Sequence, residues 1–366
     1  MKFSRFCLGL GLVLSIASCA NPASPSSPEK PVFAGYYSDG TKKVPGYWEG
    51  TAFHSLGRSL TGNACAFSPV VSSDDTTFVA GYYTAGSLCA ACYWEGDTPV
   101  PLRDATGAAF TKDSYACGIA RSGDTVYTVG VYRNDSFENS PCYWEGSTFV
   151  PLRDETGASA LDAPALALSI AVSEGTVYTC GNYSVDLTAY PCYWEGSALH
   201  SLESSLPAGA VSGDALSLLV LNGTVCAAGN YFSSENVFVP CIWEGDTLRA
   251  LSGPAADGSF PDDAHAVSIA QYDGTLYTAG YYWDGTKRVA CYWEGTTFHS
   301  LEGSLANNAC ASSIHVSDGV VLIGGEIYDG SKYIPCYWEG ETFHSLSDGT
   351  ENDGDIPDPL SFLFIS

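Results

Sequence analysis

The chain has 366 residues, of which 41 are acidic and 15 are basic, so its formal net charge is −26 at neutral pH. A chain of this length buries a large core, and so acidic a surface repels phosphate backbones, which argues against nucleic acid as a partner. Beyond the first residues no apolar run reaches about 18 residues, so no further membrane span is expected. Aromatic residues and glycine are abundant, as is typical of short strands joined by tight turns.

The first segment, residues 1–18, has the pattern of a secretory signal peptide. Lys2 and Arg5 give it a positive start, and an apolar core runs on to Ile16. Two small residues and then Cys19 follow, an arrangement that resembles the lipobox of bacterial lipoproteins. The resemblance implies that Cys19 becomes the new N-terminus and carries the acyl chains of a membrane anchor.

Residues 19–31 come next and are rich in proline and serine. Such a segment has too little apolar surface to form a core, so it predicts an extended tether. We therefore expect a monomeric body, residues 32–366, which a lipid anchor holds at the bacterial cell envelope, on its periplasmic or outer surface.

The body is built on the tripeptide Trp-Glu-Gly, which recurs seven times at intervals of 46, 50, 50, 49, 50 and 45 residues. Repeats of about 40–50 residues made of strands are the size of propeller blades. The glycine is predicted to take a positive φ in a turn, and we interpret the glutamate as its turn partner rather than as part of a functional ring. The repeated tryptophans are Trp48, Trp94, Trp144, Trp194, Trp243, Trp293 and Trp338.

Each unit reads as four strands, named A to D, that are separated by turn residues. In the clearest unit strand B is 275–282, strand C is 288–293 and strand D is 297–301, and residues 168–174 are typical of strand A. Asp-Gly pairs between strands B and C favour a twisted hairpin turn. No segment shows the apolar period of a helix over a useful length.

The two ends of the body complement each other. The first unit starts at Val32, inside strand B, and has no strand A ahead of it, while an apolar stretch, 360–366, follows the seventh unit. Asp-x-Leu-Ser, starting at Asp358, leads into this stretch, and the same pattern opens strand A at Asp214. We predict an all-β, seven-bladed β-propeller with four-stranded blades, whose ring is closed by a C-terminal strand that completes blade one.

With these seven units, residues 32–366 resemble the seven-bladed propellers of bacterial repeat lipoproteins and, more loosely, the Kelch and galactose-oxidase group. Kelch units carry a glycine pair after the second strand, as Gly324-Gly325 does here. They also carry a separated tyrosine and tryptophan, whereas Tyr292 and Trp293 are adjacent. The resemblance implies a propeller fold and leaves the ligand open.

Twelve cysteines follow Cys19, and export invites a disulfide interpretation. Most of them occupy a common position in strand C or in strand A, and two strand spacings, about 9–10 Å, are too long for a disulfide. We therefore interpret them as small buried residues at blade contacts. Cys89 and Cys92 form a CxxC motif that lacks the second pair a zinc site needs. The strand C set is Cys92, Cys142, Cys192, Cys241, Cys291 and Cys336, and the strand A set is Cys65, Cys117 and Cys310.

No metal or cofactor site is predicted. The acidic run 348–355 could offer oxygen ligands to calcium, but it lacks the DxDxDG spacing, and we interpret it as a solvated loop. His265 and His315 fall in strand A of different blades. Four further histidines fall in strand D, where the blades splay apart, so they cannot share one metal ion; these are His54, His200, His299 and His344.

The connections between strands B and C differ from blade to blade, and they carry Phe137, Phe232, Phe238 and Trp283. A constant framework with variable loops is how a scaffold presents a binding face, although drift in exposed loops explains the variation equally well. These four residues are the candidate ligand face.

Two functions from different classes follow. The first hypothesis is a non-enzymatic scaffold that binds a protein or a glycan, because no blade shows a catalytic motif such as the Asp box of sialidases. The alternative is a propeller enzyme, a hydrolase or lyase acting on glycans, with two carboxylates about 5–10 Å apart at the ring axis. A third possibility is a spacer or antigenic surface.

Overall fold

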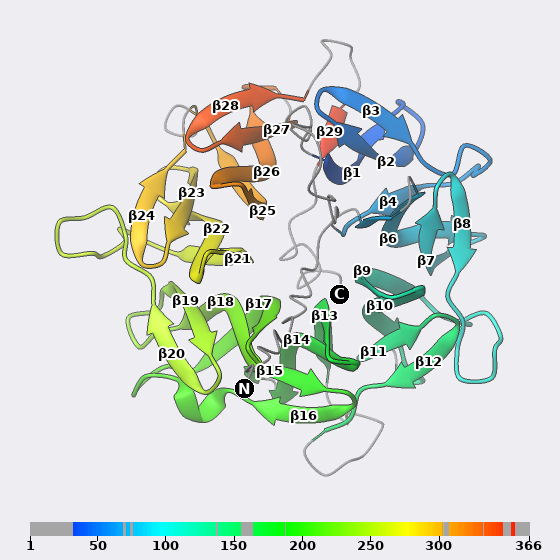
Figure 1. Ribbon diagram of the computed structural model, residues 1–366, viewed down its shortest axis with the longest axis horizontal. Coiled ribbons are helices and arrows are strands. Elements are labelled where there is room, and N and C mark those ends of the chain that lie inside the picture. Colours follow the sequence, from blue (N-terminus) through cyan, green and yellow to red (C-terminus); the bar gives the residue numbers. More distant parts are fainter. Residues whose placement is uncertain are drawn as a thin grey trace, which may run out of the picture.

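The structure, a computed structural model, describes residues 32–68, 71–73, 76–136, 138–154, 164–186, 188–301, 303, 307–331, 333–346 and 353–355. These residues form a ring of seven antiparallel sheets (Figure 1), which confirms the predicted β-propeller. Within them there is no α-helix, and a single 3-10 turn, η1, covers Glu203–Ser205. No helix of this part of the chain is long and apolar enough to cross a membrane.

The first three blades lie in chain order around the ring. Blade 1 consists of β29 (Asp353–Asp355), β1 (Val32–Ser38), β2 (Lys43–Glu49) and β3 (Ala52–Ser55). In blade 2 strand A is divided into two pieces that both pair with β6; its strands are β4 (Ala64–Ala66), β5 (Val71–Ser73), β6 (Thr76–Ala85), β7 (Leu88–Glu95) and β8 (Thr98–Pro101). Blade 3 consists of β9 (Ser114–Ser122), β10 (Thr125–Arg133), β11 (Asn139–Glu145) and β12 (Thr148–Pro151).

The other four blades repeat the order A, B, C, D. Blade 4 consists of β13 (Ala165–Ser173), β14 (Thr176–Val185), β15 (Thr188–Glu195) and β16 (Ala198–Ser201), and blade 5 of β17 (Ser212–Leu221), β18 (Thr224–Phe232), β19 (Phe238–Glu244) and β20 (Thr247–Ala250). Blade 6 consists of β21 (Ala264–Tyr272), β22 (Thr275–Trp283), β23 (Arg288–Glu294) and β24 (Thr297–Ser300), and blade 7 of β25 (Ala309–Ser317), β26 (Val320–Tyr328), β27 (Tyr333–Glu339) and β28 (Thr342–Ser345).

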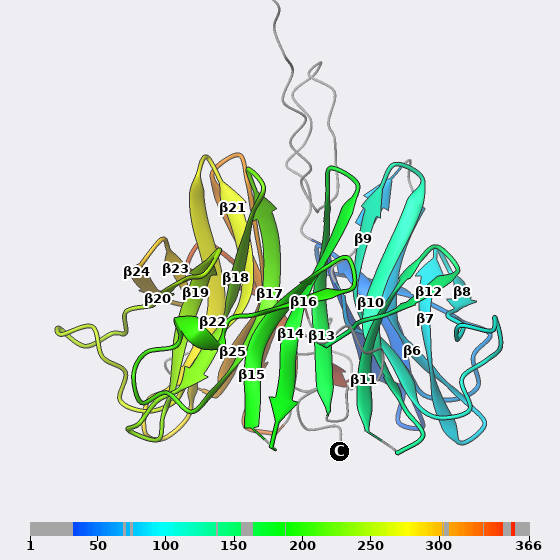
Figure 2. The same cartoon turned by 90° about the horizontal axis from the view of Figure 1, so that it is seen from below.

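Strand A of each blade lies nearest the ring axis and strand D lies at the periphery (Figure 1). The strands run roughly along the axis, so their connections gather on two opposite faces (Figure 2). We name the face that holds the B–C connections and the start of each strand A the loop face. The opposite face, which holds the A–B turns and the Trp-Glu-Gly turns, is the turn face. The glycines of the seven Trp-Glu-Gly turns have φ between 55° and 60°, as predicted.

The ring closes through the C-terminal segment, as predicted, because β29 pairs antiparallel with β1. The register places Asp355 where Asp214 stands in blade 5, whereas the sequence comparison placed Asp358 there. A three-residue strand is held by its backbone hydrogen bonds, and the pattern of side chains in the sequence does not show which residues form them. The predicted strand 360–366 lies outside the described residues.

Strand B needs a glycine because strand A bulges toward it. In blade 6 the register shifts between Ala266 and Ser268, so Val267 is an extra residue. Strand A then approaches so closely that a Cβ on Gly280 would lie 1.9 Å from the carbonyl oxygen of His265. Only glycine fits there, and blades 3, 4, 5 and 7 show the same shift.

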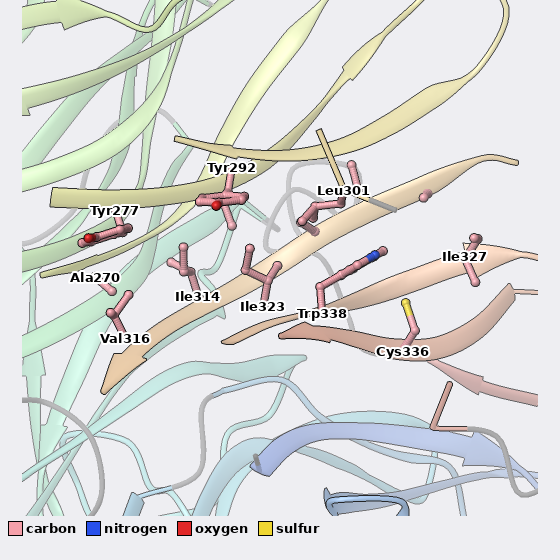
Figure 3. Packing of buried hydrophobic residues seen from close by; sticks show 14 residues of the cluster. Ala270, Tyr277, Tyr292, Leu301, Ile314, Val316, Ile323, Ile327, Cys336 and Trp338 are labelled. Carbon is pink, nitrogen blue, oxygen red and sulfur yellow. The ribbon is translucent and has the colours of Figure 1, made fainter. Parts of the chain in front are cut away.

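The hydrophobic core is divided among the contacts between neighbouring blades, and each of the seven contacts holds one cluster of buried residues. Between blades 6 and 7, Trp338, Ile323 and Ile314 pack against Tyr277 and Leu301 (Figure 3). Burial of a large apolar side chain contributes about 1.5–3 kcal/mol. No blade buries such a face alone, so the blades stabilise one another.

The twelve cysteines of the body are all free thiols, and all except the half-buried Cys89 are buried. The six strand C cysteines lie in the clusters between neighbouring blades, as predicted, whereas Cys117 and Cys310 of strand A belong to a cluster that joins the inner strands of several blades. Cys192 lies opposite Gly181 while Cys180 lies opposite Tyr193, so the cysteines of neighbouring strands point to opposite faces of the sheet.

In several blades the repeated tryptophan also forms a hydrogen bond to the blade before it. The indole N–H of Trp194 in blade 4 donates to the carbonyl oxygen of Arg153, which follows blade 3, at 2.9 Å. Trp94 is equally buried, but its Nε1 has no hydrogen-bond partner within the described residues. Equivalent bonds join Trp144 to Arg103 at 2.8 Å and Trp293 to Ser252 at 2.7 Å.

This difference gives a matched pair of variants. Trp194→Phe and Trp94→Phe remove the same ring volume, but only the first removes an indole hydrogen bond. We expect Trp194→Phe to lower the free energy of unfolding by about 1 kcal/mol more than Trp94→Phe. Urea unfolding of both variants measures this difference, and equal losses would show that the indole hydrogen bond contributes nothing.

Candidate ligand-binding site

Three of the four predicted ligand-face residues lie together on the loop face of blades 5 and 6. Phe232 ends β18 and Phe238 begins β19, with 5.0 Å between their ring centroids. Trp283 ends β22 of the next blade. Phe137 lies outside the described residues.

Beside these aromatic residues the loop face is hollowed by a cavity of about 290 Å³. Its walls come from the connection that enters β21, from β21 itself, and from the facing ends of β22 and β23. Sugar-sized ligands fit a concave site that combines aromatic surface with a few polar groups. The lining residues are Asp262, Asp263, His265, Tyr281, Trp283 and Arg288.

Arg288 is the only cation in that lining. Its guanidinium carbon lies 5.6 Å from the ring centroid of Tyr281 and 5.7 Å from that of Tyr333 in blade 7. Nη2 donates to the hydroxyl of Tyr333 at 2.9 Å. Within the described residues it forms no ion pair with a carboxylate. The two aromatic rings therefore hold Arg288 in place while other N–H groups stay available to a ligand.

Asp263 lines the cavity and also stabilises the fold. Its Oδ1 accepts from the backbone N–H of Phe238 in the preceding blade at 2.8 Å, and its carbonyl oxygen accepts from the backbone N–H of Trp283 at 2.7 Å. Asp113 and Asn308 make the same two contacts in other blades. The side chain of Asp262 accepts from the N–H of Asp263, and its second oxygen can accept from a ligand.

His265 lies at the inner end of the cavity, between the rings of Phe238 and Tyr281, at centroid distances of 5.0 and 5.1 Å. Its Nδ1 is 3.0 Å from Oδ1 of Asn230. Burial, and secondarily the charge of Arg288, lower the pKa of His265 to about 4. The imidazole is therefore neutral at physiological pH.

Behind His265 lies a buried carboxyl group, Asp214 of β17. Asn182 Nδ2 donates to its Oδ1 at 2.5 Å and Asn230 Nδ2 donates to its Oδ2 at 3.4 Å. Burial raises the pKa of Asp214, and the two amide hydrogen bonds oppose this rise. Its side chain is 8 % exposed, so the carboxylate holds neighbouring blades together rather than meeting a substrate.

Deeper in the ring, the inner strands carry apolar residues. The extra residues of four bulges are buried in one cluster with side chains from blades 2 and 7, and they are Cys117, Leu168, Leu216 and Val267. The polar groups instead lie at the starts of the inner strands, near the loop face. A ligand that reaches the polar groups therefore enters from that face.

The other sequence candidates lie elsewhere. The strand D histidines each stack on the tyrosine opposite them in strand C, as His200 does on Tyr193 with 4.7 Å between the centroids and 3° between the ring planes. The described part of the chain contains no group of three or more His, Cys, Asp or Glu side chains placed to hold a metal ion. Most of the acidic run 348–355 is outside the described residues, so the calcium hypothesis is not tested.

A second hollow of about 200 Å³ lies on the loop face at blades 1 and 2 and includes Lys42, Lys43 and Arg58. The ammonium groups of the two lysines already donate, to the carbonyl oxygen of Leu60 and to the hydroxyl of Tyr36. These lysines therefore stabilise the fold rather than bind a ligand.

Sequence reasoning located Trp283 but missed Arg288, Asp262 and Asp263, because their convergence depends on which loop faces which neighbouring blade. A signal was present in strand B, immediately after the required glycine. That position faces the following blade in blades 4 and 5. It carries four residue types in the seven blades, as Tyr36, Tyr82, Val131, Asn182, Asn230, Tyr281 and Glu326.

No protein-family model and no curated protein matches this sequence. Among solved structures, a lectin from Aleuria aurantia, a six-bladed β-propeller with fucose recognition, matches with 11 % identity, a TM-score of 0.45, and coverage of 75 % of this chain and 92 % of that one. The BP39L lectin of Burkholderia pseudomallei matches with 11 % identity, a TM-score of 0.44, and coverage of 86 % and 92 %. A Trypanosoma rangeli sialidase, solved with sialic acid, matches with 11 % identity, a TM-score of 0.42, and coverage of 85 % and 56 %. Similarities this weak carry no functional argument.

The burial of His265 predicts a pH dependence. Since its pKa falls from 6.5 to about 4 on folding, the unfolded state binds more protons between these values, and stability falls as pH drops through this window. We expect the NMR signals of the His265 imidazole to titrate near pH 4. His265→Gln identifies these signals, and its unfolding free energy should lose this part of the pH dependence. Titration near pH 6.5 would show that the surroundings of His265 do not lower its pKa.

Proposed function

We propose that this protein is a non-enzymatic glycan-binding propeller that is exported and anchored at the cell envelope through Cys19. The cavity on the loop face of blades 5 and 6 carries the proposal. Its volume of about 290 Å³ is near the lower end of the range for small-molecule pockets. A concave site of this size suits one or two sugar rings better than the flat contact surface of a folded protein.

The chemistry of the cavity matches that of a neutral sugar. Sugar hydroxyl groups both donate and accept hydrogen bonds, and here Arg288 donates while Asp262 accepts. The C–H face of a sugar ring is apolar and can lie on the exposed part of Trp283. The strong negative charge of the chain disfavours anionic glycans.

The position of the chain entry agrees with an anchored binding protein. β1 starts at Val32, which pairs with Glu49 beside a Trp-Glu-Gly turn, so the chain enters the ring at the turn face. The cavity opens on the loop face, on the opposite side of the ring. A tether that joins the turn face therefore leaves the cavity directed away from the membrane.

The enzymatic alternative requires two accessible carboxylates at the axis. Asp214, the buried carboxylate beside the cavity, is occupied by two asparagine amides. The carboxylates of the cavity are Asp262 and Asp263, and the latter already holds the start of β19. Glycan binding is compatible with the hydrogen bonds that these carboxylates already make. A hydrolase would have to break the hydrogen bonds of at least one of them.

A glycan array probed with the full chain in detergent tests the proposal. We expect saturable binding to neutral glycans, and we expect Trp283→Ala to weaken it at least about tenfold, which corresponds to about 1.4 kcal/mol. Tyr272→Ala is the matched control, because Tyr272 is an exposed aromatic residue on the turn face. A folded protein that binds no glycan, or equal losses in both variants, would reject the site.

The lipid anchor has its own test. Cys19→Ser removes the sulfur that the acyl chains require, so we expect the protein to move from the membrane fraction to the soluble fraction and to lose incorporation of labelled fatty acid. Because Cys19 precedes the folded body, thermal stability should be unchanged. Membrane association that survives the substitution would overturn the proposed anchor.

A further inference from the structure

A chain of hydrogen bonds runs from the interior of the ring to the cavity and crosses three blades. It begins at Asn182 in blade 4, passes through Asp214 and Asn230 in blade 5, and ends at His265 in blade 6. The three heavy-atom distances are 2.5, 3.4 and 3.0 Å. A buried carboxyl and a half-buried imidazole in one connected chain restrict where each proton can lie.

The direction of each bond follows from the carboxylate. Both asparagines turn their NH₂ groups toward Asp214, which is the orientation that a carboxylate, as a pure acceptor, requires. This leaves Oδ1 of Asn230 directed at His265, and an amide oxygen only accepts. Nδ1 of His265 must therefore carry the proton that fills this 3.0 Å contact.

The other ring nitrogen of His265 is then an acceptor. A neutral imidazole carries one proton, so a proton on Nδ1 leaves Nε2 with a free lone pair. Within the described residues Nε2 has no hydrogen-bond partner, and it is not among the buried unpaired atoms. The polar groups that share its cavity are Asp262, Asp263, Tyr281 and Arg288.

We propose that Asp214 is a positioning residue of the glycan site, which acts through Asn230 to hold His265 as the Nδ1–H tautomer and so presents Nε2 to the ligand as a hydrogen-bond acceptor. The inference rests on the proposed glycan function for the identity of the ligand. The arrangement of protons rests only on the geometry of the four side chains.

The consequence is a directional site. Arg288 can only donate, whereas Nε2 of His265 and the carboxylate of Asp262 can only accept. A sugar that binds here must place a hydroxyl proton at His265 and an oxygen lone pair at Arg288. A glycoside whose group at the histidine is methylated has no proton to give, and it loses this bond.

The first test is the proton position itself, measured on the full chain with ¹⁵N-labelled histidine. Two-bond ¹H–¹⁵N correlation spectra distinguish the two neutral tautomers, and His265→Gln identifies the signals. We expect Nδ1 at the position of a protonated nitrogen and Nε2 at that of an unprotonated one near pH 7. The opposite assignment, or a charged imidazole, would overturn the proposal whether or not glycans bind.

The second test breaks the chain behind the histidine. Asp214→Asn introduces an NH₂ group that can turn the Asn230 amide around, so we expect the Nε2–H tautomer to become populated and glycan affinity to fall about tenfold. Asp113→Asn is the matched control, because Asn308 occupies the corresponding position in another blade, and it should change neither. If Asp214→Asn leaves the tautomer unchanged, Asp214 does not position His265.

The two proposals fail in different ways. A wild-type Nδ1–H tautomer in a protein that binds no glycan rejects the glycan function and keeps the proton arrangement. Glycan binding with the Nε2–H tautomer keeps the function and rejects the role of Asp214. Should Asp214→Asn not fold, the wild-type spectrum still tests whether His265 is the Nδ1–H tautomer, and the opposite tautomer overturns the proposal.

Discussion

The contact between neighbouring blades is the interaction on which the rest of the molecule depends. Each Trp-Glu-Gly tryptophan is buried between its own blade and the preceding one, and several of them donate an indole hydrogen bond across that contact. A four-stranded blade has two faces and cannot bury both alone, so stability accumulates only as blades are added. The contact between blades 7 and 1 buries Phe33, Trp48 and Leu346, and β29 supplies the inner neighbour that β1 of blade 1 otherwise lacks.

This division of the core frees other positions to vary. The tryptophan, the small residue two positions before it and the strand B glycine maintain the geometry in nearly every blade. The residue that follows this glycine is therefore under no packing constraint shared by all blades. Blades 2 and 3 place tyrosine and cysteine near the axis, where Tyr82 and Tyr115 meet edge to face. Blades 4 to 6 place amides, a carboxyl and an imidazole there. One side of an otherwise regular ring thereby becomes polar.

The electrostatics of that side follow from burial. Solvent exclusion disfavours charge on both Asp214 and His265, raising one pKa and lowering the other. Two amide donors supply the stabilisation that a buried carboxylate requires, and the imidazole remains neutral. Arg288 keeps its charge because a guanidinium is not deprotonated in proteins, and two aromatic rings and a tyrosine hydroxyl hold it beside the cavity. A neutral imidazole beside a held cation favours ligands that carry hydroxyl groups.

Much of this architecture can be predicted from the sequence alone. The spacing of seven tryptophans predicted the blades, and the Asp-Gly and Glu-Gly pairs predicted the turns. The missing first strand A predicted closure of the ring by the C-terminal segment. These predictions were possible because backbone chemistry and strand periodicity act over a few residues. Trp283 was recognised as a ligand-face candidate for the same reason, as an aromatic residue in a variable connection. The register of β29 and the convergence of Arg288, Asp262 and His265 were decided only by the tertiary structure. These depend on how far each blade turns about the axis and on which backbone groups face each other across a blade contact, and no local pattern contains that information.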